Sequence, residues 1–233
     1  MPAHRSSAEA DVRDAVVARL RERRPDARII HEINASTYGP NRIDVLAVSP
    51  AEIIAVEVKS AKDKLDRLPA QIAAMRGCSH QVIAALHEKF LIELPTNRGA
   101  AHSERDGQFY VRTTPAIAPR PDAVWVFPEI KRNMHDDGWC HLAPWQLATA
   151  KFDAALPAGA IDLLWRDELA WLCGSLGIAT SRRSNMSDMV SALRWNCTGR
   201  EITKGICAAL RLRQCVEADP AIEPTRNPIP AGA

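Results

Sequence analysis

The stretch NRIDVLAVSPAEIIAVEVKS, residues Asn41 to Ser60, decides how this chain of 233 residues folds. Its two apolar runs, RIDVLAV and EIIAVEVK, are rich in isoleucine and valine and are separated by a serine-proline turn, which predicts two strands. The same stretch carries Asp44, Glu57 and Lys59, although charged side chains are rare in the interior of a protein. Where these charges fall is therefore the first pointer to function.

Alternation along the second run shows where the charges lie. Side chains alternate between the two faces of a strand, which divides the run into two sets. One set is Ile53, Ala55, Glu57 and Lys59, and the other is Ile54, Val56 and Val58. Both sets begin apolar, which predicts a central strand that is covered on both faces and carries charge only at its carboxyl end.

The residues around this pair predict an α/β unit over residues 6–90. Ser6 and Glu9 form a capping-box pattern that opens a helix with an apolar stripe at Val12, Val16 and Leu20. The expected strands are 28–33, 42–48, 52–59 and 81–86, and a helix over 63–75, regular from Pro69, separates the last two. A helix between two strands favours a right-handed crossover to a parallel neighbour. The expected order is α-β-β-β-α-β around a mixed central sheet.

The remainder of the chain divides into segments of different composition. Residues 95–122 are rich in glycine, proline and polar residues and predict a loop excursion, followed by strands at 123–127 and 139–145 on the same sheet. Apolar residues at helical spacing predict a small unit of three helices within 160–216. The proline-rich residues 217–233 predict a disordered tail. The expected domains are an α/β domain over 1–150 and this helical unit.

Composition excludes several classes of protein. The formal charge of +2 arises from 30 basic and 28 acidic residues, so any basic surface must be local. Six scattered cysteines without a CxxC pair predict reduced thiols and a cytoplasmic protein. No apolar run approaches the length of a membrane span, so we expect no membrane partner. The tryptophans that could stack on bases are expected to be core residues instead, namely Trp125, Trp139, Trp145, Trp165 and Trp171.

Hairpin pairing of the two strands would place Asp44 opposite Glu57. Two carboxylates at the end of a central strand form an oxygen-rich site suited to Mg²⁺, completed by a backbone carbonyl such as that of Val58 and by water. A neighbouring lysine can orient a water molecule or stabilise developing charge in phosphodiester hydrolysis. The alternative is a buried ion pair of Lys59 with Glu57 or Asp44 that only holds the strands together.

Asp44 followed by Glu57-Val58-Lys59 on the next strand resembles the core of the PD-(D/E)XK nuclease superfamily. The proline of that motif is absent, since Asn41-Arg42-Ile43 precedes Asp44. The resemblance implies a restriction-endonuclease-like fold, an acidic pair that binds Mg²⁺ or Mn²⁺ and a lysine that assists attack on a DNA phosphate. It also implies DNA as the partner, and a homodimer as the state in which many members cut.

The stretch from Glu57 to Gln71, with its E-x-K-S strand and L-x-R-L-P-x-Q helix, is similar to small bacterial and phage members of the superfamily. The resemblance implies that Gln71 assists near the metal or phosphate, and that Glu9 or Glu32 is an auxiliary metal ligand. Glu9 alternatively serves only as the helix cap, and Gln71 as an ordinary residue on a helix flank. The biological processes that the resemblance leaves open are DNA repair, recombination and mobile-element defence.

Basic residues offer two candidate DNA contacts. Arg42, Lys62 and Lys64 could line a phosphate track beside the site, although lysines in a turn are more often simply solvated. In the helical unit, the loop with Arg182 and Arg183 between two helices resembles a SAP-type DNA-binding motif without its glycine-lysine pair. A plain helical cap on the α/β domain is the alternative for this unit.

Two rival functions stay open from the sequence. The first is a catalytically inactive nuclease-fold module that binds nucleic acid or a partner protein. The second is a zinc protein, but the cysteine and histidine residues lack a recognisable four-ligand spacing; they are Cys78, His80, His135, Cys140 and His141.

Overall fold

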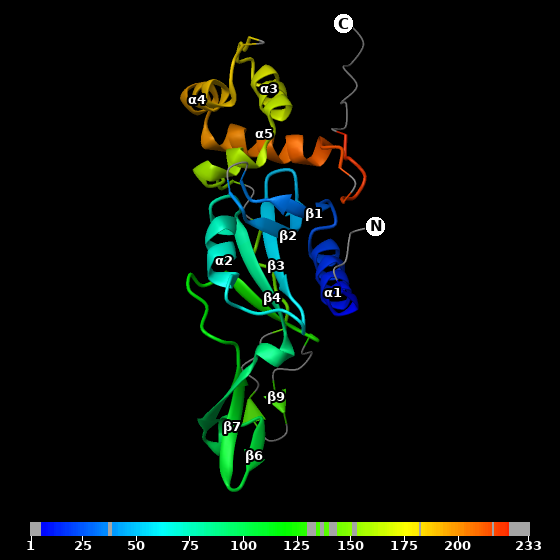
Figure 1. Ribbon diagram of the computed structural model, residues 1–233, viewed down its shortest axis with the longest axis vertical. Helices are drawn as coiled ribbons and strands as arrows, with labels where there is room; N and C mark the ends of the chain where they lie inside the picture. The colour runs from blue at the N-terminus through cyan, green and yellow to red at the C-terminus, as the bar shows by residue number, and fades with distance from the viewer. Residues whose placement is uncertain are drawn as a thin grey trace, which may run out of the picture.

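The computed structural model describes residues 6–36, 39–129, 134–135, 138–139, 144–150, 153–181, 183–215 and 217–223. Its centre is a five-stranded sheet with the order β1-β2-β3-β4-β8 (Figure 1). The strands are β1 (Arg28–Asn34), β2 (Arg42–Val48), β3 (Ile53–Lys59), β4 (Gln81–His87) and β8 (Ala123–Phe127). β1, β2 and β3 pair antiparallel, whereas β4 pairs parallel with both β3 and β8. The predicted α/β class with a mixed central sheet is confirmed.

Helices cover both faces of this sheet (Figure 1). α1 (Ser7–Arg23) packs its apolar stripe in one buried cluster with Val56 of β3. α2 (Leu68–Arg76) packs Ile72 in another cluster with Ala55 on the opposite face of the same strand. Every residue of β3 is buried, as the alternation predicted. The strand that carries the charges is therefore central and covered on both sides.

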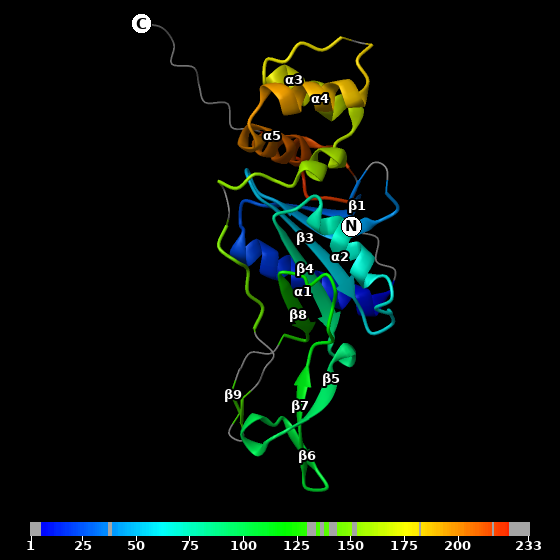
Figure 2. The ribbon, with the colours of Figure 1, turned by 90° about the vertical axis from the view of Figure 1, so that its left-hand side faces the viewer.

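The chain between β4 and β8 forms a second sheet where the sequence predicted a loop. The short helical turns η1 (Glu88–Phe90) and η2 (Arg98–Ala100) accompany β5 (Ile92–Thr96), β6 (Ser103–Arg105) and β7 (Gln108–Thr113). The strands pair antiparallel in the order β5-β7-β6 and project from one end of the molecule (Figure 2). Asp106 and Gly107 have φ angles of 52° and 76°, as an aspartate-glycine hairpin turn requires. The predicted loop is therefore wrong for most of its length.

The segment before the helical unit also differs from prediction. β9 (Met134–His135) and β10 (Gly138–Trp139) pair with each other and not with the main sheet, and residues 140–143 lie outside the described residues. Trp145 is buried and stacks on Trp125, with ring centroids 4.9 Å apart. These two tryptophans are core residues, as predicted.

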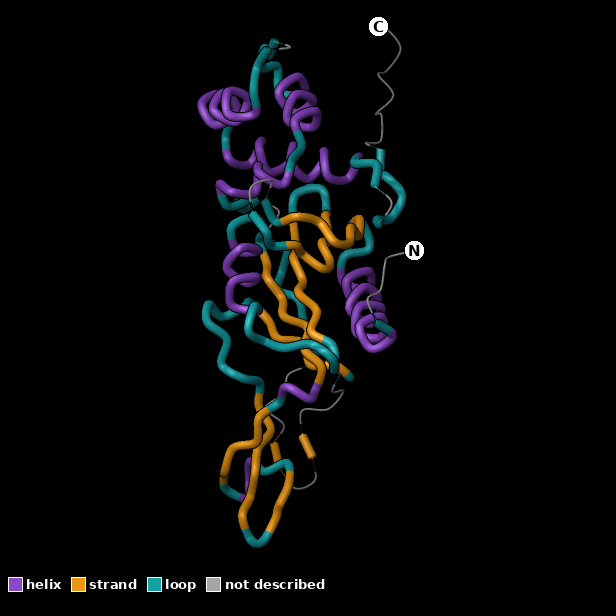
Figure 3. Tube along the Cα trace, in the orientation of Figure 1, coloured by secondary structure: helices purple, strands orange, loops and turns teal. Residues whose placement is uncertain are grey.

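The three predicted carboxyl-terminal helices are present. They are α3 (Arg166–Ser175), α4 (Met186–Asn196) and α5 (Gly199–Leu212), preceded by the 3₁₀ helix η3 (Ala158–Leu163). Figure 3 shows them stacked at the end of the main sheet opposite the projecting sheet. Leu163 and Leu210 share one buried cluster with Ile30 and Leu46 of the sheet. The helical unit and the α/β domain therefore form one continuous core. Trp165 and Trp171 are exposed, however, so the prediction that they are core residues is wrong.

The start of the predicted disordered tail is ordered. Ala218 forms an antiparallel bridge with Ile30, and the Asp219 backbone N–H donates to the carbonyl of Ile29. The Arg28 guanidinium donates to the carbonyls of Asp219 and Leu210. The tail prediction is wrong for residues 217–223, and 224–233 lie outside the described residues. None of the helices in the described part of the chain is long and apolar enough to cross a membrane.

Candidate functional site

Asp44 and Glu57 meet where β2 and β3 separate. The ladder between these strands pairs Val45 with Val56, so Asp44 is the next residue opposite Glu57. Asp44 Oδ2 accepts a hydrogen bond of 2.7 Å from the Val58 backbone N–H, which fixes the carboxylate at the end of the ladder. The structure brings the two acids together as hairpin pairing predicted.

Lys59 is held between a strand and a helix. Its ammonium donates to Glu57 Oε1 at 2.5 Å and to Gln71 Oε1 at 3.0 Å. Gln71 lies in α2, whose start at Leu68 places this side chain over the strand end. Gln71 is therefore in contact with Lys59 and is not merely a solvated residue on a helix flank. Lys59 itself is buried, so these two acceptors fix its position.

The second oxygen of Glu57 has no such partner. The side chain is 1 % exposed, and its Oε2 makes no hydrogen bond to any described residue. Burial, reinforced by the charge of Asp44 and opposed by Lys59 and Gln71, raises the pKa of Glu57 to about 8. Burial also raises the pKa of Asp44, against the Val58 hydrogen bond and the charges of Arg13 and Lys59. Burial is the largest cause of both shifts, and a bound cation would favour the charged forms of the two carboxyl groups.

Arg13 of α1 joins the acidic residues into one cluster, and sequence reasoning missed it. Its fully buried guanidinium donates to Glu9 Oε1 at 2.6 Å, to Glu32 Oε1 at 2.7 Å and to the Asp44 carbonyl at 2.8 Å. Burial alone would lower the pKa of Arg13, but the three carboxylates outweigh it and raise that pKa. The four-residue spacing of Glu9 and Arg13 on the helix was the available signal.

Glu9 and Glu32, the two predicted auxiliary metal ligands, therefore both form ion pairs with Arg13. The Ser6 hydroxyl accepts from the Glu9 backbone N–H at 3.3 Å, which confirms Ser6 as the helix cap, but the Glu9 carboxylate pairs with Arg13, so the prediction that Glu9 completes a capping box is wrong. Glu32 has a φ of 54°, an uncommon conformation for a residue with a side chain, and it interrupts the β1–β2 ladder opposite Asp44. Its second oxygen lies 3.0 Å from Arg42. Both acids line the same cavity as Asp44 and Glu57, and Glu32 lies opposite Asp44 on the neighbouring strand.

A cavity of about 130 Å³, here called the site cavity, connects these groups. Its walls include all the predicted catalytic and metal-binding residues: Glu9, Glu32, Asp44, Glu57, Val58, Lys59 and Gln71. Among the described residues, no three His, Cys, Asp or Glu side chains are grouped to hold a metal ion by themselves. Mg²⁺, however, usually takes one or two carboxylates and fills its remaining positions with water and substrate oxygens. Asp44 and Glu57 meet that smaller requirement.

The predicted DNA contacts are not all near this cavity. Arg42 lines it with a half-exposed guanidinium, and Lys62 and Lys64 are exposed on the turn that follows β3. Arg183 is exposed in the connection between α3 and α4, and Figure 1 shows this connection on the side of the helical unit that faces away from the main sheet. Arg182 lies outside the described residues. The structure therefore brings Arg42 to the site but does not bring Arg183.

The zinc alternative finds no support among the described residues. His80 Nδ1 accepts from the Ile53 backbone N–H at 3.1 Å, and its Nε2 faces the Ala154 carbonyl at 3.1 Å. Burial raises the pKa of Cys78 to about 12, so its thiol stays protonated. Cys140 and His141 lie outside the described residues.

Comparison with known families places the candidate site in a matched segment. Residues 3–96 match the family described as Bacteriophage P4 protein cII, which is less than half of the chain. No curated protein and no solved structure matches. The matched segment runs from α1 to β5 and contains Arg13 together with every predicted catalytic and metal-binding residue. The chain is thus similar to a phage protein family over the part that builds the site.

Proposed function

We propose that this protein is a divalent-metal-dependent nuclease of the PD-(D/E)XK type that hydrolyses DNA phosphodiester bonds. The observation that carries the proposal is the buried Oε2 of Glu57, which lacks a hydrogen-bond partner among the described residues. The other oxygen of the same carboxylate holds Lys59. Glu57 can therefore fix the lysine with one oxygen and bind a cation with the other. The α-β-β-β-α-β order supports a restriction-endonuclease-like core.

The residues fit Mg²⁺ or Mn²⁺. Asp44 and Glu57 would hold the ion together with the carbonyl of Val58, a set of oxygen donors that hard cations prefer. Bound there, the ion would neutralise charge on the scissile phosphate and favour ionisation of a water molecule. The buried Oε2 of Glu57, which has no hydrogen-bond partner among the described residues and lines the site cavity with Asp44, supports this assignment.

Lys59 is the residue that acts on the reacting groups. An ammonium has three N–H donors, and Glu57 and Gln71 accept two of them. The third is left for the attacking water or for a phosphate oxygen, where positive charge stabilises the transition state. Gln71 positions the ammonium, and Arg13 positions Asp44 by binding its carbonyl oxygen.

Arg42 is the first candidate for a contact with the DNA backbone. It is half-exposed at the rim of the site cavity, and Lys62 and Lys64 follow on the next exposed turn. Lysine and arginine side chains in such positions bind phosphates and set the register of the strand. Repair, recombination and mobile-element defence are the processes in which such an activity would serve.

The test is cleavage of linear duplex, supercoiled, single-stranded and branched DNA in the presence of Mg²⁺, Mn²⁺ or EDTA. We expect cleavage that depends on the metal and is lost in Asp44→Ala and Lys59→Ala. Lys204→Ala, which removes an exposed lysine of α5, is the matched control and should cut like the wild type. Full turnover by the Lys59→Ala protein would contradict the proposal.

One observation favours a second candidate, an inactive nuclease-fold module that binds nucleic acid or a partner protein. Arg13 already pairs with Glu9 and Glu32 and lies 3.7 Å from Asp44, while Lys59 pairs with Glu57. The cluster could therefore be a set of ion pairs without a metal. A ligand that binds only the folded state raises the melting temperature. No rise with Mg²⁺ or Mn²⁺, and no cleavage of any substrate, would favour this candidate.

A further inference from the structure

A second and larger cavity lies between the sheet and the helical unit. It encloses about 570 Å³ and is here called the β1 cavity, because residues 30–34 of β1 form one wall. Leu163, Trp165 and Arg213 of the helical unit contribute to the opposite wall. Its volume is within the range of about 300 to 1,000 Å³ that is usual for small-molecule sites. A single nucleoside is of a size to enter it.

The β1 cavity adjoins the site cavity. Glu32 and Arg42 line both, with their carboxylate and guanidinium 3.0 Å apart. A strand of nucleotides that occupies one cavity can therefore continue past this ion pair toward the other. The half-exposed Arg42 is at this boundary, where it can contact the phosphate that joins two neighbouring nucleotides.

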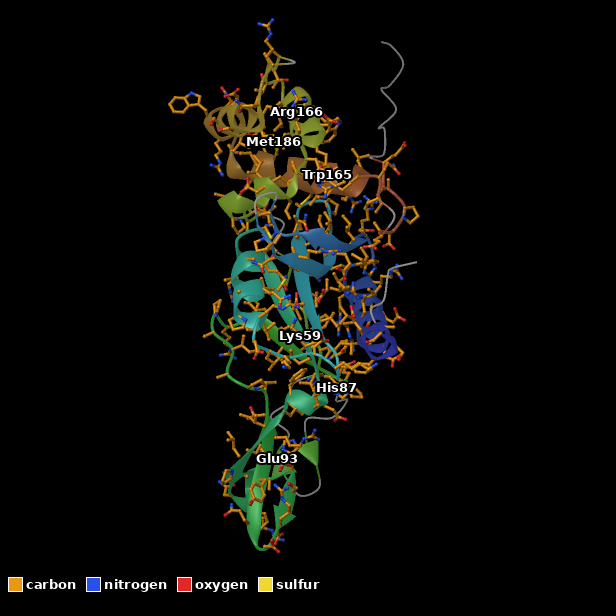
Figure 4. All side chains as sticks on the ribbon, in the orientation of Figure 1. Lys59, His87, Glu93, Trp165, Arg166 and Met186 are labelled. Atoms are coloured by element: carbon orange, nitrogen blue, oxygen red, sulfur yellow. The ribbon has the colours of Figure 1, made fainter. Side chains whose placement is uncertain are left out.

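Trp165 gives the β1 cavity an aromatic surface. The side chain is 56 % exposed, although tryptophan is usually well buried. The Arg213 guanidinium lies 4.3 Å from the ring centroid. In Figure 4, Trp165 lies between the helical unit and the sheet. An exposed indole beside a guanidinium is the combination on which unpaired bases stack.

Arg213 and Glu168 fix the position of Trp165. Arg213 binds both oxygens of Glu168, at 2.6 and 2.5 Å, and donates to the Leu163 carbonyl at 2.7 Å. Glu168 also accepts from the Trp165 backbone N–H at 2.7 Å. The positions of the Trp165 ring and the Arg213 guanidinium are therefore fixed before a ligand binds, which lowers the entropic cost of binding.

We propose that the β1 cavity receives an unpaired base of the DNA strand whose phosphate lies at Lys59. This inference rests on the proposed function and deepens it, because it specifies the substrate. A base within a duplex is stacked and paired on both sides, and it must leave the helix to enter a pocket. Because Trp165 and Lys59 lie toward opposite ends of the main sheet (Figure 4), the preferred substrates are then single strands, or duplexes that have unpaired nucleotides to one side of the cut.

The experiment measures binding to the full-length protein in EDTA, so that no cleavage is needed. Fluorescence anisotropy compares a labelled single-stranded oligonucleotide with a blunt duplex, for the wild type, Trp165→Ala and Trp165→Phe. Trp195→Ala is the matched control, because this α4 tryptophan is 89 % exposed and does not line the cavity. The melting temperature of each variant verifies that it is folded.

We expect Trp165→Ala to weaken single-strand binding by about fivefold or more, the usual loss for a stacked base. Duplex binding should be unchanged, and Trp165→Phe should keep most of the affinity because a phenyl ring still stacks. A 2-aminopurine base in the strand should be quenched by the wild type and by Trp195→Ala, but not by Trp165→Ala. Equal binding by Trp165→Ala and wild type, or an equal loss on duplex and single strand, would overturn the inference.

The two proposals fail separately. Metal-dependent cleavage together with unaltered binding by Trp165→Ala would remove the base site and leave the nuclease standing. Single-strand binding that depends on Trp165, without cleavage of any substrate, would remove the nuclease and leave a nucleic-acid-binding cavity.

Discussion

Two buried glutamates at opposite ends of β3 have different surroundings. Glu52 precedes the strand and is fully buried, with one oxygen 2.6 Å from Arg24 and the other 2.7 Å from the Gln81 amide. Glu57 is buried to the same degree, but only one of its oxygens has a partner among the described residues. Burial is equal, so the difference lies in how completely each carboxylate is satisfied.

Under the proposed function, this difference separates a structural charge from a functional one. A buried ion contributes to a stable fold only when its partners satisfy it, and removal of one partner is costly. Glu52 meets that condition and ties the first helix to the sheet through Arg24. Glu57 does not meet that condition, because its Oε2 has no hydrogen-bond partner among the described residues. Under the proposed function, this oxygen binds the cation.

The largest effect should come from Lys59→Ala. The variant loses the ammonium at the reacting groups, and we expect the cleavage rate to fall by at least about a hundredfold. The fold should persist, because Glu57 can be neutral when buried. Initial rates on the best substrate, with circular dichroism of the same samples, measure both. If the variant loses its structure instead, Lys59 is needed for the fold, as Glu52 is.

At the other end of β3, Arg24→Ala should act on stability alone. It leaves the buried Glu52 without its cation, and we expect the free energy of unfolding to fall by about 3 to 5 kcal/mol. Urea denaturation gives this value. Cleavage per folded molecule should equal that of the wild type. A loss of specific activity as large as that of Lys59→Ala would remove the contrast between the two ends.

The pH dependence of stability should identify Glu57 in the metal-free protein. Its pKa is raised from 4.5 in the unfolded chain to about 8, so between these values the folded state keeps a proton that the unfolded state releases. This group therefore makes stability fall as pH rises through that window. Glu57→Gln cannot ionise and should show a smaller fall in melting temperature from about pH 5 to about pH 8. If the melting temperatures of both proteins fall equally between these pH values, the pKa of Glu57 is not raised in the folded state.

The smallest effect should come from Gln71→Ala. Lys59 loses one of its two acceptors but keeps Glu57, so we expect a loss of about tenfold in the cleavage rate with little change in stability. Gln81→Ala removes the corresponding amide from Glu52 and should lower the melting temperature without changing specific activity. If the two variants exchange these effects, the assignment of the two ends is wrong.

Local patterns in the sequence predicted the centre of the fold and much of the site. The alternation in residues 52–59 gave a central strand, and the strand spacing gave the meeting of Asp44 with Glu57. Arg13 was not predictable in the same way, because its partners Glu32 and Asp44 lie 19 and 31 residues away on two strands. A single charged residue beside an apolar stripe does not reveal such contacts.

Other errors have different causes. The sheet over 92–113 was missed because its strands are short and lie among glycine, proline and charged residues, although Asp106-Gly107 is a strong hairpin signal. The contact of Ala218 with Ile30 depends on the free backbone groups of β1, which no periodicity in residues 217–223 encodes. Composition predicted a loop and a disordered tail in these segments and did not predict their backbone pairing.

The ordered segment 217–223 has a consequence for the solubility of the protein. β1 is the outermost strand of the main sheet, and an uncovered outermost strand is a template for pairing with another chain. Glu217 and Asp219 occupy that edge with backbone hydrogen bonds to His31 and Ile29. The carboxyl-terminal segment thus blocks pairing of β1 with a strand of another copy. A shorter protein that ends after α5 would expose the β1 edge and would aggregate more readily.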